Sequence, residues 1–332
     1  MSSTPRASAL APFHVRSFRF QWPADLATSW AFEMETLILG WYVLVETRSV
    51  FMLTVFASLL YIGTLLAPMF GVIGDRVGNR NLLCAMRGLF AVLATTLMTL
   101  AFLDLLTPAL VLAIATVLGL VRPSDIGVRA ALVGETMPGA QLMGAMSIQR
   151  TTLDSARIVG ALTGAGLVAA LGMGPAYVVV ASFYAISVLL TLKGGSGRRE
   201  YRETARPSPW RDLREGLAYV WNTPHLFAMM CLAFLLNLTA FPLFISLMPY
   251  VAKEVYLADQ TTLGYMVAGA AFGALLGSIA LSRHGGAIRP GRMMIVFCAA
   301  WYAMLFAFAH TQHPTAGIPV LVLAGCAQSL GL

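Results

Sequence analysis

Charged residues are scarce in this chain. Asp, Glu, Lys and Arg make up 11% of its 332 residues, and hydrophobic residues make up 58%. A soluble domain contains about a quarter charged residues and about one half apolar residues. A globule of the present composition has too few polar side chains to cover its surface, so lipid must solvate most of the exterior. The composition therefore predicts an all-α integral membrane protein.

Cysteines and enzyme motifs are also sparse. The four cysteines, Cys84, Cys231, Cys298 and Cys326, lie inside apolar runs and lack the spacing of metal ligands. We find no Walker lysine motif, no GxGxxG that opens a soluble strand–helix unit and no HExxH. We therefore expect no disulfide framework, no metal site, no cofactor, no enzyme activity and no ATP-driven pumping by this chain.

Long apolar runs dominate what is present. A helix needs about 20 apolar residues to cross a bilayer. About ten segments meet this requirement. The predicted spans are Trp22–Val45, Met52–Ile73, Leu82–Leu103, Ala109–Val133, Gln141–Leu171, Gly174–Leu192, Leu226–Val251, Leu263–Leu281, Met293–His310 and Ala316–Leu332.

The net charge of +7 does not indicate nucleic-acid binding, because most arginines lie in short loops between apolar runs. Every second loop is basic. These loops carry Arg76 and Arg80, then Lys193 to Arg214, then Arg283 to Arg292. The basic side of a membrane protein faces the cytoplasm. The pattern predicts a multi-pass protein of the bacterial inner membrane with its N-terminus inside.

A polar linker divides the chain. We expect an N-terminal six-helix bundle over 1–192, a cytoplasmic linker over 193–225 and a C-terminal bundle of about four helices over 226–332. Trp210, Leu213, Leu217 and Val220 have helical spacing, which indicates a short amphipathic helix on the membrane surface. The pattern of a helix, a short acidic loop, a second helix and a turn from Gly to Arg occurs around Glu46–Arg80 and again around Glu254–Arg289. Such internal repeats are typical of secondary transporters.

The sharpest local motif is GVIGDRVGNRNLL, over Gly71–Leu83. Gly71 and Gly74 permit close approach of helices, and Gly78 permits a tight turn. A carboxylate such as Asp75 at the membrane edge needs a cationic partner or a helix N-terminus. Arg76, Arg80 and the start of a neighbouring helix are the candidates.

This motif resembles the loop signature of the major facilitator superfamily, GxLaDrxGrkxxl. Asp75, Gly78 and Arg80 match it, and Asn79 replaces a usual basic residue. The resemblance implies two six-helix bundles and a cytoplasmic gate in which this loop packs against the eleventh helix. The members of this family usually have twelve helices, whereas about ten are predicted here. We therefore expect a truncated gene or a fragment that lacks the last two helices.

Further resemblances point to the bacterial efflux branch that includes enterobactin and macrolide exporters. Arg122 and Asp125 match an arginine motif of the fourth helix, and DLREGLAYVWNTPHL is similar to the linker of this branch. In the fifth helix Gly160 and Gly164 match the exporter motif gxxxGPxxGG. Alanines replace its proline and its last glycine, which weakens the inference of antiport.

The fourth and fifth helices each carry an Arg-Asp-Arg set at steps of three and four residues, which places each set on one helix face. The two sets are Arg122, Asp125 and Arg129, and Arg150, Asp154 and Arg157. Each set has one surplus positive charge. A charge at mid-bilayer costs about 2.5–3.5 kcal/mol on insertion scales, so each needs a partner or an aqueous cavity.

The first helix supplies Glu33, Glu35 and Asp25 as candidate counter-charges and proton-coupling groups. Glu33 and Glu35 lie about 200° apart around a helix, so at most one can face a central cavity. We favour Glu33 for that cavity. The alternative is a salt-bridge network that only holds the bundle together. Asn237 and Gln328 are further cavity candidates, because amides in a membrane need partners.

The sequence therefore predicts a secondary transporter that exports a small amphipathic molecule by proton-coupled alternating access. Its partners are expected to be membrane lipid, a small-molecule substrate and protons, without nucleic acid, and the monomer is the expected form. An uptake symporter, a facilitated-diffusion carrier and a non-transporting truncated remnant or scaffold remain open. A membrane-embedded enzyme is disfavoured, because the charges lie deep in the helices and do not converge at one membrane face.

Overall fold

The structure is a computed structural model that describes residues 11–195, 218–242, 246–284 and 290–331. No strand occurs in those ranges, which confirms the all-α prediction. The α-helices are α1 (Arg16–Thr47), α2 (Val50–Leu59), α3 (Ala67–Val77), α4 (Asn79–Phe102), α5 (Pro108–Thr136), α6 (Gly139–Leu171), α7 (Met173–Lys193), α9 (Pro224–Phe241), α10 (Met248–Tyr250), α11 (Gln260–His284), α12 (Pro290–Ala309) and α13 (Pro314–Gly331). Short 3-10 helices occur at Ala11–His14 and Ile62–Leu66, and a π-helical turn occurs at Val251–Val255.

Eight helical segments of the described residues are long and apolar enough to cross a membrane. Two predicted spans fall outside this set. The first corresponds to α1, which carries Asp25, Glu33 and Glu35 in its interior. The second corresponds to α12, whose apolar part Met293–Ala309 is shorter. The integral membrane character is therefore confirmed, while the count of ten spans is approximate.

The predicted span Met52–Ile73 is interrupted. The chain leaves the α-helical path after Leu59, forms a 3-10 turn and resumes as α3 with Pro68 in its first turn. Proline fits the first turn of a helix because the N–H that it lacks has no partner there. The predicted span Leu226–Val251 also breaks near Pro242, where α9 ends. The predicted amphipathic linker helix lies largely outside the described residues, and only 218–221 of it is described as helical.

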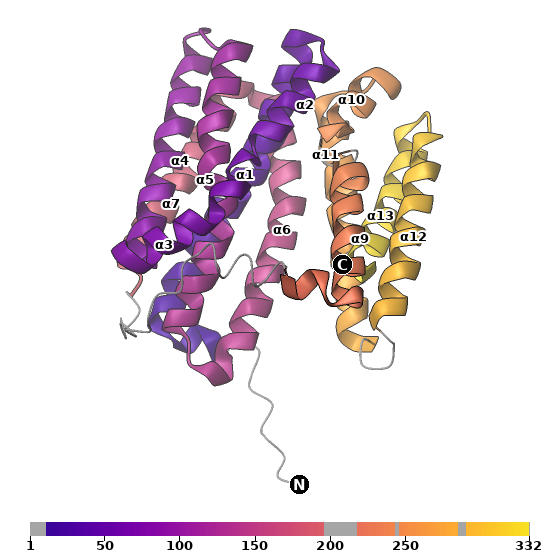
Figure 1. Ribbon diagram of the computed structural model, residues 1–332. Coiled ribbons are helices and arrows are strands. Elements are labelled where there is room, and N and C mark those ends of the chain that lie inside the picture. Colours follow the sequence, from indigo (N-terminus) through magenta and orange to yellow (C-terminus); the bar gives the residue numbers. More distant parts are fainter. Residues whose placement is uncertain (1–10, 196–217, 243–245, 285–289, 332) are drawn as a thin grey trace.

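The helices form two groups, α1 to α7 and α9 to α13, which lie side by side in Figure 1. In the first group, the α2–α3 connection packs backbone to backbone against α5. A Cβ atom on Gly63 would overlap the carbonyl oxygen of Leu120, and a Cβ on Gly119 would overlap that of Leu59. Glycine is required at such a crossing because any side chain would hold the two backbones apart.

The second group contains a matching crossing between α11 and α13. A Cβ on Gly273 would overlap the carbonyl oxygen of Val322, and a Cβ on Gly325 would overlap that of Ala270. These glycines follow Gly63 and Gly119 by about two hundred residues, the spacing expected for an internal repeat. The same small-residue crossing thus occurs once in each group.

The two groups meet through α6 and α11 (Figure 1). Leu37 of α1 and Ala161 and Ala165 of α6 share a buried cluster with residues of the second group. The members from the second group include Met248, Ala252, Tyr256, Leu263, Met266 and Ala270. These residues belong to the later parts of α1 and α6, to the segment from α10 to the start of α11, and to the earlier part of α11. We call this the far end, and we call the end that carries Arg16, Arg80 and Lys193 the basic end.

The first turn of α11 is capped by Asp259. Its Oδ1 accepts hydrogen bonds from the backbone N–H and the hydroxyl of Thr262, both at 2.9 Å. These bonds, the backbone one foremost, lower the pKa of Asp259 below its ordinary value of 3.8. A carboxyl with a lowered folded-state pKa stabilises the fold above its unfolded pKa, and the contribution is lost as the pH falls through the folded pKa.

We expect Asp259→Ala to lower the free energy of unfolding by about 1 kcal/mol at neutral pH, because the cap is lost. The difference from the unaltered protein should shrink below about pH 4, where the carboxyl becomes protonated. Thermal denaturation in detergent, at neutral pH and below about pH 4, measures the stability difference between the variant and the unaltered protein. A deficit of equal size at both pH values would show that the carboxylate charge is not involved.

Candidate functional site

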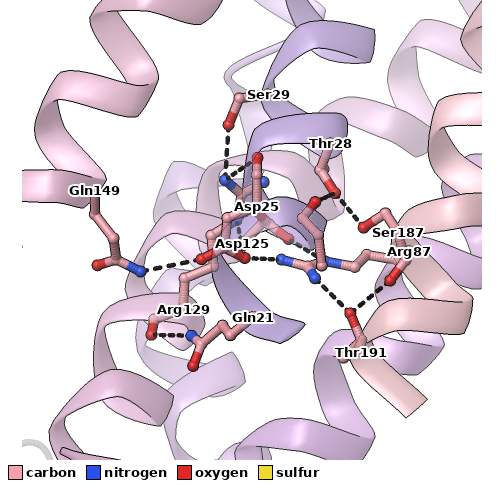
Figure 2. Close-up of polar contacts among 11 residues, drawn as sticks. Gln21, Asp25, Thr28, Ser29, Arg87, Asp125, Arg129, Gln149, Ser187 and Thr191 are labelled. Carbon is pink, nitrogen blue, oxygen red and sulfur yellow. Dashed lines mark hydrogen bonds and ion pairs between the residues drawn. The ribbon is translucent and has the colours of Figure 1, made fainter. Parts of the chain in front are cut away.

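Four charged side chains form a closed cluster inside the first helix group (Figure 2). Asp25 of α1 forms an ion pair with Arg87 of α4, and a second carboxylate–guanidinium approach of 3.7 Å joins it to Arg129 of α5. The other oxygen of Asp25 accepts a hydrogen bond from the side-chain amide of Gln149 of α6 at 3.1 Å. Arg87 also donates to the hydroxyl of Thr191 of α7. Five helices are therefore tied to one carboxylate.

Asp125 completes the cluster. It forms an ion pair with Arg129 one helical turn further along α5, and its Oδ1 lies 3.9 Å from Nε of Arg87. Arg129 also donates to the hydroxyl of Ser29 at 2.8 Å. Asp25, Asp125, Arg87 and Arg129 are each at most 5% exposed. Two acids and two arginines balance, so the cluster is neutral and faces other helices instead of lipid.

This cluster corrects part of the sequence analysis. Arg122, Asp125 and Arg129 were expected to form one charged face of the fourth span. The structure places Asp125 and Arg129 in the buried cluster, but it places Arg122 beside a separate cavity. Neither Glu33 nor Glu35 pairs with this helix. Asp25 and Arg87 complete a neutral cluster with Asp125 and Arg129, so the surplus positive charge of the set stays on Arg122.

The cavity lies between the two helix groups and has a volume of about 160 Å³. Its lining is mostly apolar and comes from α1, α2, α5, α6, α11, α13 and the region from α9 to α10. The polar or charged residues that line it are Glu33, Thr36, Tyr61, Arg122, Arg157, Ser246 and Gln328. Pockets with apolar walls and a few convergent polar groups are typical of small-molecule sites.

Glu33 and Arg157 form the ionic wall of the cavity. A Glu33 oxygen lies 3.6 Å from Nε of Arg157, and the side chains are 29% and 51% exposed. Arg157 also lies 3.9 Å from Asp154, which is in turn 3.8 Å from the exposed Arg150. The three charged residues of the fifth span thus form a chain of contacts from Arg150 through Asp154 to Arg157. Arg157 connects this chain to Glu33 of α1.

Arg122 stands apart from these ion pairs. It donates to the hydroxyl of Thr36 at 2.7 Å and to the backbone carbonyl of Phe32 at 3.0 Å. Its guanidinium carbon lies 4.3 Å from the centre of the Phe32 ring, a cation–π distance. Among the described residues, no carboxylate comes within ion-pair distance of Arg122.

Glu35 points away from the cavity, as the helical angle between it and Glu33 requires. It is 1% exposed, and one oxygen accepts the hydroxyl of Tyr184 of α7 at 2.8 Å. Tyr184 itself packs against Phe32 and Phe90. The three acids predicted as counter-charges, Asp25, Glu33 and Glu35, therefore occupy three different environments, namely the buried cluster, the cavity wall and an aromatic pocket.

The loop for which a gating role is predicted joins α3 and α4 at the basic end. Gly78 has a φ angle of 95°, a left-handed conformation that glycine adopts without strain. Asn79, at the position of the usual basic residue, donates to a carboxylate oxygen of Glu135 at 2.6 Å. Arg80 donates to backbone carbonyls at the end of α7, including that of Thr191 at 3.2 Å. Asp75 and Arg76, the other predicted members of the gate, are exposed.

Gly71 and Gly74, the two glycines of the motif that lie in α3, differ in their surroundings. Gly74 is buried, and a Cβ there would overlap the side-chain oxygen of Asn79. Gly71 was expected to allow close helix approach as well, but no atom lies within 4 Å of a Cβ built there, so that expectation was wrong. The glycine at 71 therefore faces open space in this structure.

We expect Gly74→Ala to lower the free energy of unfolding by about 1–3 kcal/mol, because its methyl group displaces Asn79 from Glu135. The control Gly71→Ala should be neutral or stabilising by up to about 1 kcal/mol, since alanine favours a helix where there is room. Unfolding in mixed micelles measures both. Equal losses in the two variants would contradict the assigned contacts.

The glycine motif of the fifth span packs α6 against α1. A Cβ on Gly160 would lie 2.7 Å from Cβ of Glu33, and one on Gly164 would lie 3.0 Å from Cα of Met34. The alanines that replace the exporter residues face the other helix group. A Cβ on Gly264 of α11 would lie 2.6 Å from Cβ of Ala165. This segment therefore lies between the first helix and the second group.

The two amide candidates have different positions. Gln328 lines the cavity, as expected. Asn237 does not line it; its side chain is exposed and donates to the carbonyl of Ala233 one turn back at 2.8 Å. An amide can satisfy itself on its own helix, so the presence of one in an apolar span does not require a cavity.

The sequence analysis missed Arg87, Gln149 and Tyr184. The signal for Arg87 was present, since an arginine inside the predicted span Leu82–Leu103 needs a counter-charge. Nothing local distinguishes Gln149 or Tyr184 from polar residues that face solvent or lipid, because their partners are distant in sequence.

A family profile described as transmembrane secretion effector matches residues 7–331. The fold is similar to a mutant of the nucleoside transporter NupG, with a TM-score of 0.70, 14% identity, and coverage of 95% of this chain and 80% of that one. A search of curated protein sequences finds no match.

Two other solved structures are similar to the chain. One is a bacterial homologue of the human lysosomal transporter Spinster in an inward-facing, unoccupied conformation, with a TM-score of 0.68, 14% identity, and coverage of 94% and 73%. The other is a D-xylose–proton symporter, with a TM-score of 0.63, 12% identity, and coverage of 94% and 80%. At these identities the similarity concerns the fold alone.

Proposed function

The chain belongs to the transmembrane secretion effector family of major facilitator transporters, and from this premise we propose that it exports a small amphipathic molecule in exchange for protons. The proposal includes membership of the bacterial efflux branch that contains the enterobactin and macrolide exporters. The basic end would face the cytoplasm of a bacterial cell, with the N-terminus inside.

The observation that carries the proposal is the position of Glu33. It is the one acid of α1 that lines the cavity, and its partner Arg157 belongs to α6, the helix that contacts the second group. Glu33 is a partly exposed carboxylate on the cavity wall, and we therefore assign proton exchange to it. Protonation would free Arg157, which would change the charge on the cavity wall.

In the proposed mechanism, alternating access couples the movement of protons to the movement of the solute. The buried contacts between the groups gather toward the far end, around Leu37, Ala165 and Leu263. This arrangement supports a state in which the far end is closed and the cavity communicates with the basic end. A carrier must also reach the reverse state, and rocking of one bundle against the other about a central site is the usual way.

Uptake by proton symport is the alternative, and the fold similarity to a D-xylose–proton symporter keeps it open. The two functions share the carboxylate and the cavity. They differ in the direction in which an imposed proton gradient moves the solute, so the direction of flux separates them.

The test uses proteoliposomes and two permanently charged, poorly permeant solutes, benzenesulfonate and phenyltrimethylammonium. We expect saturable flux of at least one solute, driven by a pH gradient. Glu33→Gln should lower the gradient-driven rate at least about tenfold, because the carboxylate can no longer exchange a proton. Glu46→Gln is the matched control, since Glu46 is an exposed acid at the end of the same helix. Unchanged proton-driven flux in Glu33→Gln would rule out the proposed role.

A further inference from the structure

The charge on the cavity wall is not balanced. Among the residues that line it are two arginines, Arg122 and Arg157, and one acid, Glu33, which leaves one positive charge. Glu33 is held by Arg157 at 3.6 Å. The excess therefore resides on Arg122.

The surroundings of Arg122 do not neutralise it. Its hydrogen bonds go to the hydroxyl of Thr36 and the carbonyl of Phe32, which are uncharged acceptors. Glu35 acts on Arg122 electrostatically, but it is buried outside the cavity and accepts the Tyr184 hydroxyl. A guanidinium carries five N–H groups, so donors remain for an oxyanion after these two bonds.

A cation at membrane depth requires a counter-charge, and the described protein residues provide none within ion-pair distance of Arg122. The rest of the wall is apolar, with Leu53, Phe56 and Phe241 among its members. A cavity of about 160 Å³ is close to those that hold a single aromatic ring. The free charge and the apolar walls together define a ligand with an oxyanion at one end and a small apolar body at the other.

We propose that the transported molecule is an amphipathic organic anion whose carboxylate, sulfonate or phosphate group binds Arg122. The ring of Phe32 and the Thr36 hydroxyl hold the guanidinium so that its free N–H groups face the cavity. Planar, two-point recognition of an oxyanion is the interaction for which arginine is best suited. This substrate class rests on the proposed transport function, but binding can be measured without transport.

The experiment measures equilibrium binding to the full chain in lipid nanodiscs. The ligands are three compounds of similar shape, namely benzenesulfonate, the neutral benzenesulfonamide and the cationic phenyltrimethylammonium. We expect benzenesulfonate to bind at least about tenfold more tightly than either of the others. Equal affinities, a preference for the amide or the cation, or no saturable binding of the sulfonate up to about 10 mM would overturn the proposal.

Variants assign the preference to one residue. Arg122→Gln should abolish the preference for the sulfonate, and Arg122→Lys should retain part of it, because lysine keeps the charge without the planar fork. Arg48→Gln is the control for lost positive charge, since Arg48 is exposed between α1 and α2 and does not line the cavity. If Arg157→Gln abolished the preference and Arg122→Gln did not, the assignment to Arg122 would be wrong.

Flux measurements distinguish a failure of the proposed anion site from a failure of the proposed transport function. Proton-driven movement of phenyltrimethylammonium without binding of the sulfonate would leave transport intact and overturn the anion site. Selective sulfonate binding that depends on Arg122, without flux of either solute in proteoliposomes, would support the anion site and contradict transport.

Discussion

The variant Asp25→Asn is expected to lose about 3–5 kcal/mol of unfolding free energy, enough to abolish accumulation of the protein in the membrane. Removal of this carboxylate leaves Arg87 and Arg129 with only Asp125 between them, in a site that water does not reach. An unpaired buried charge is far more costly than the loss of the attraction itself. Unfolding in mixed micelles and the yield of folded protein measure the effect.

A double variant tests the electrostatic origin of this loss. Asp25→Asn combined with Arg87→Met removes one charge of each sign, so it should be more stable than Asp25→Asn alone. Glu254→Gln serves as the surface control and should change the stability by less than about 0.5 kcal/mol, since Glu254 is exposed. A loss below about 1 kcal/mol in Asp25→Asn would contradict the closed cluster.

The second large effect is expected at the contact between the helix groups. In Gly264→Leu the new side chain would run into Ala165 and the backbone carbonyl of Ala161, which lies 3.2 Å from a Cβ at 264. Overpacking costs about 1–3 kcal/mol, and it acts only on the state in which α6 and α11 touch. The population of that state should therefore fall by about 5-fold to 150-fold relative to the alternative state.

Spin labels at the ends of α6 and α11 report this shift. We expect Gly264→Leu to lengthen the distance across the far end and to slow transport. Gly166→Leu is the control on α6, because no atom lies within 4 Å of a Cβ built at 166. An unchanged distance distribution in Gly264→Leu, with the protein folded, would show that this contact does not define the conformational state.

The sequence predicts those parts of the fold that depend on interactions between residues close together in the chain. Apolar run length and the basic loops predict the helices, and Gly78 predicts the tight turn that its φ of 95° produces. The interruption after Leu59 was missed, because it results from the backbone packing of Gly63 against α5, which is distant in sequence. Helix contacts of this kind leave no periodic signal.

The site was predictable to the extent that helix geometry constrains it. The angular separation of Glu33 and Glu35 requires them to face different surroundings, and one of them lines the cavity. The partners could not be assigned by charge counting alone. Arg122 was grouped with Asp125 from its spacing, but one helical turn along α5 separates the cavity from the buried cluster.

Alternating access requires that the two ends of the molecule open reciprocally around one cavity. The decisive measurement is of two spin-label distances, one between positions 171 and 257 at the far end and one between positions 143 and 281 at the basic end, all four with exposed side chains. When the pH is changed in the presence of benzenesulfonate, the first distance should lengthen while the second shortens. Distances that stay constant, or that change in the same direction, would contradict alternating access.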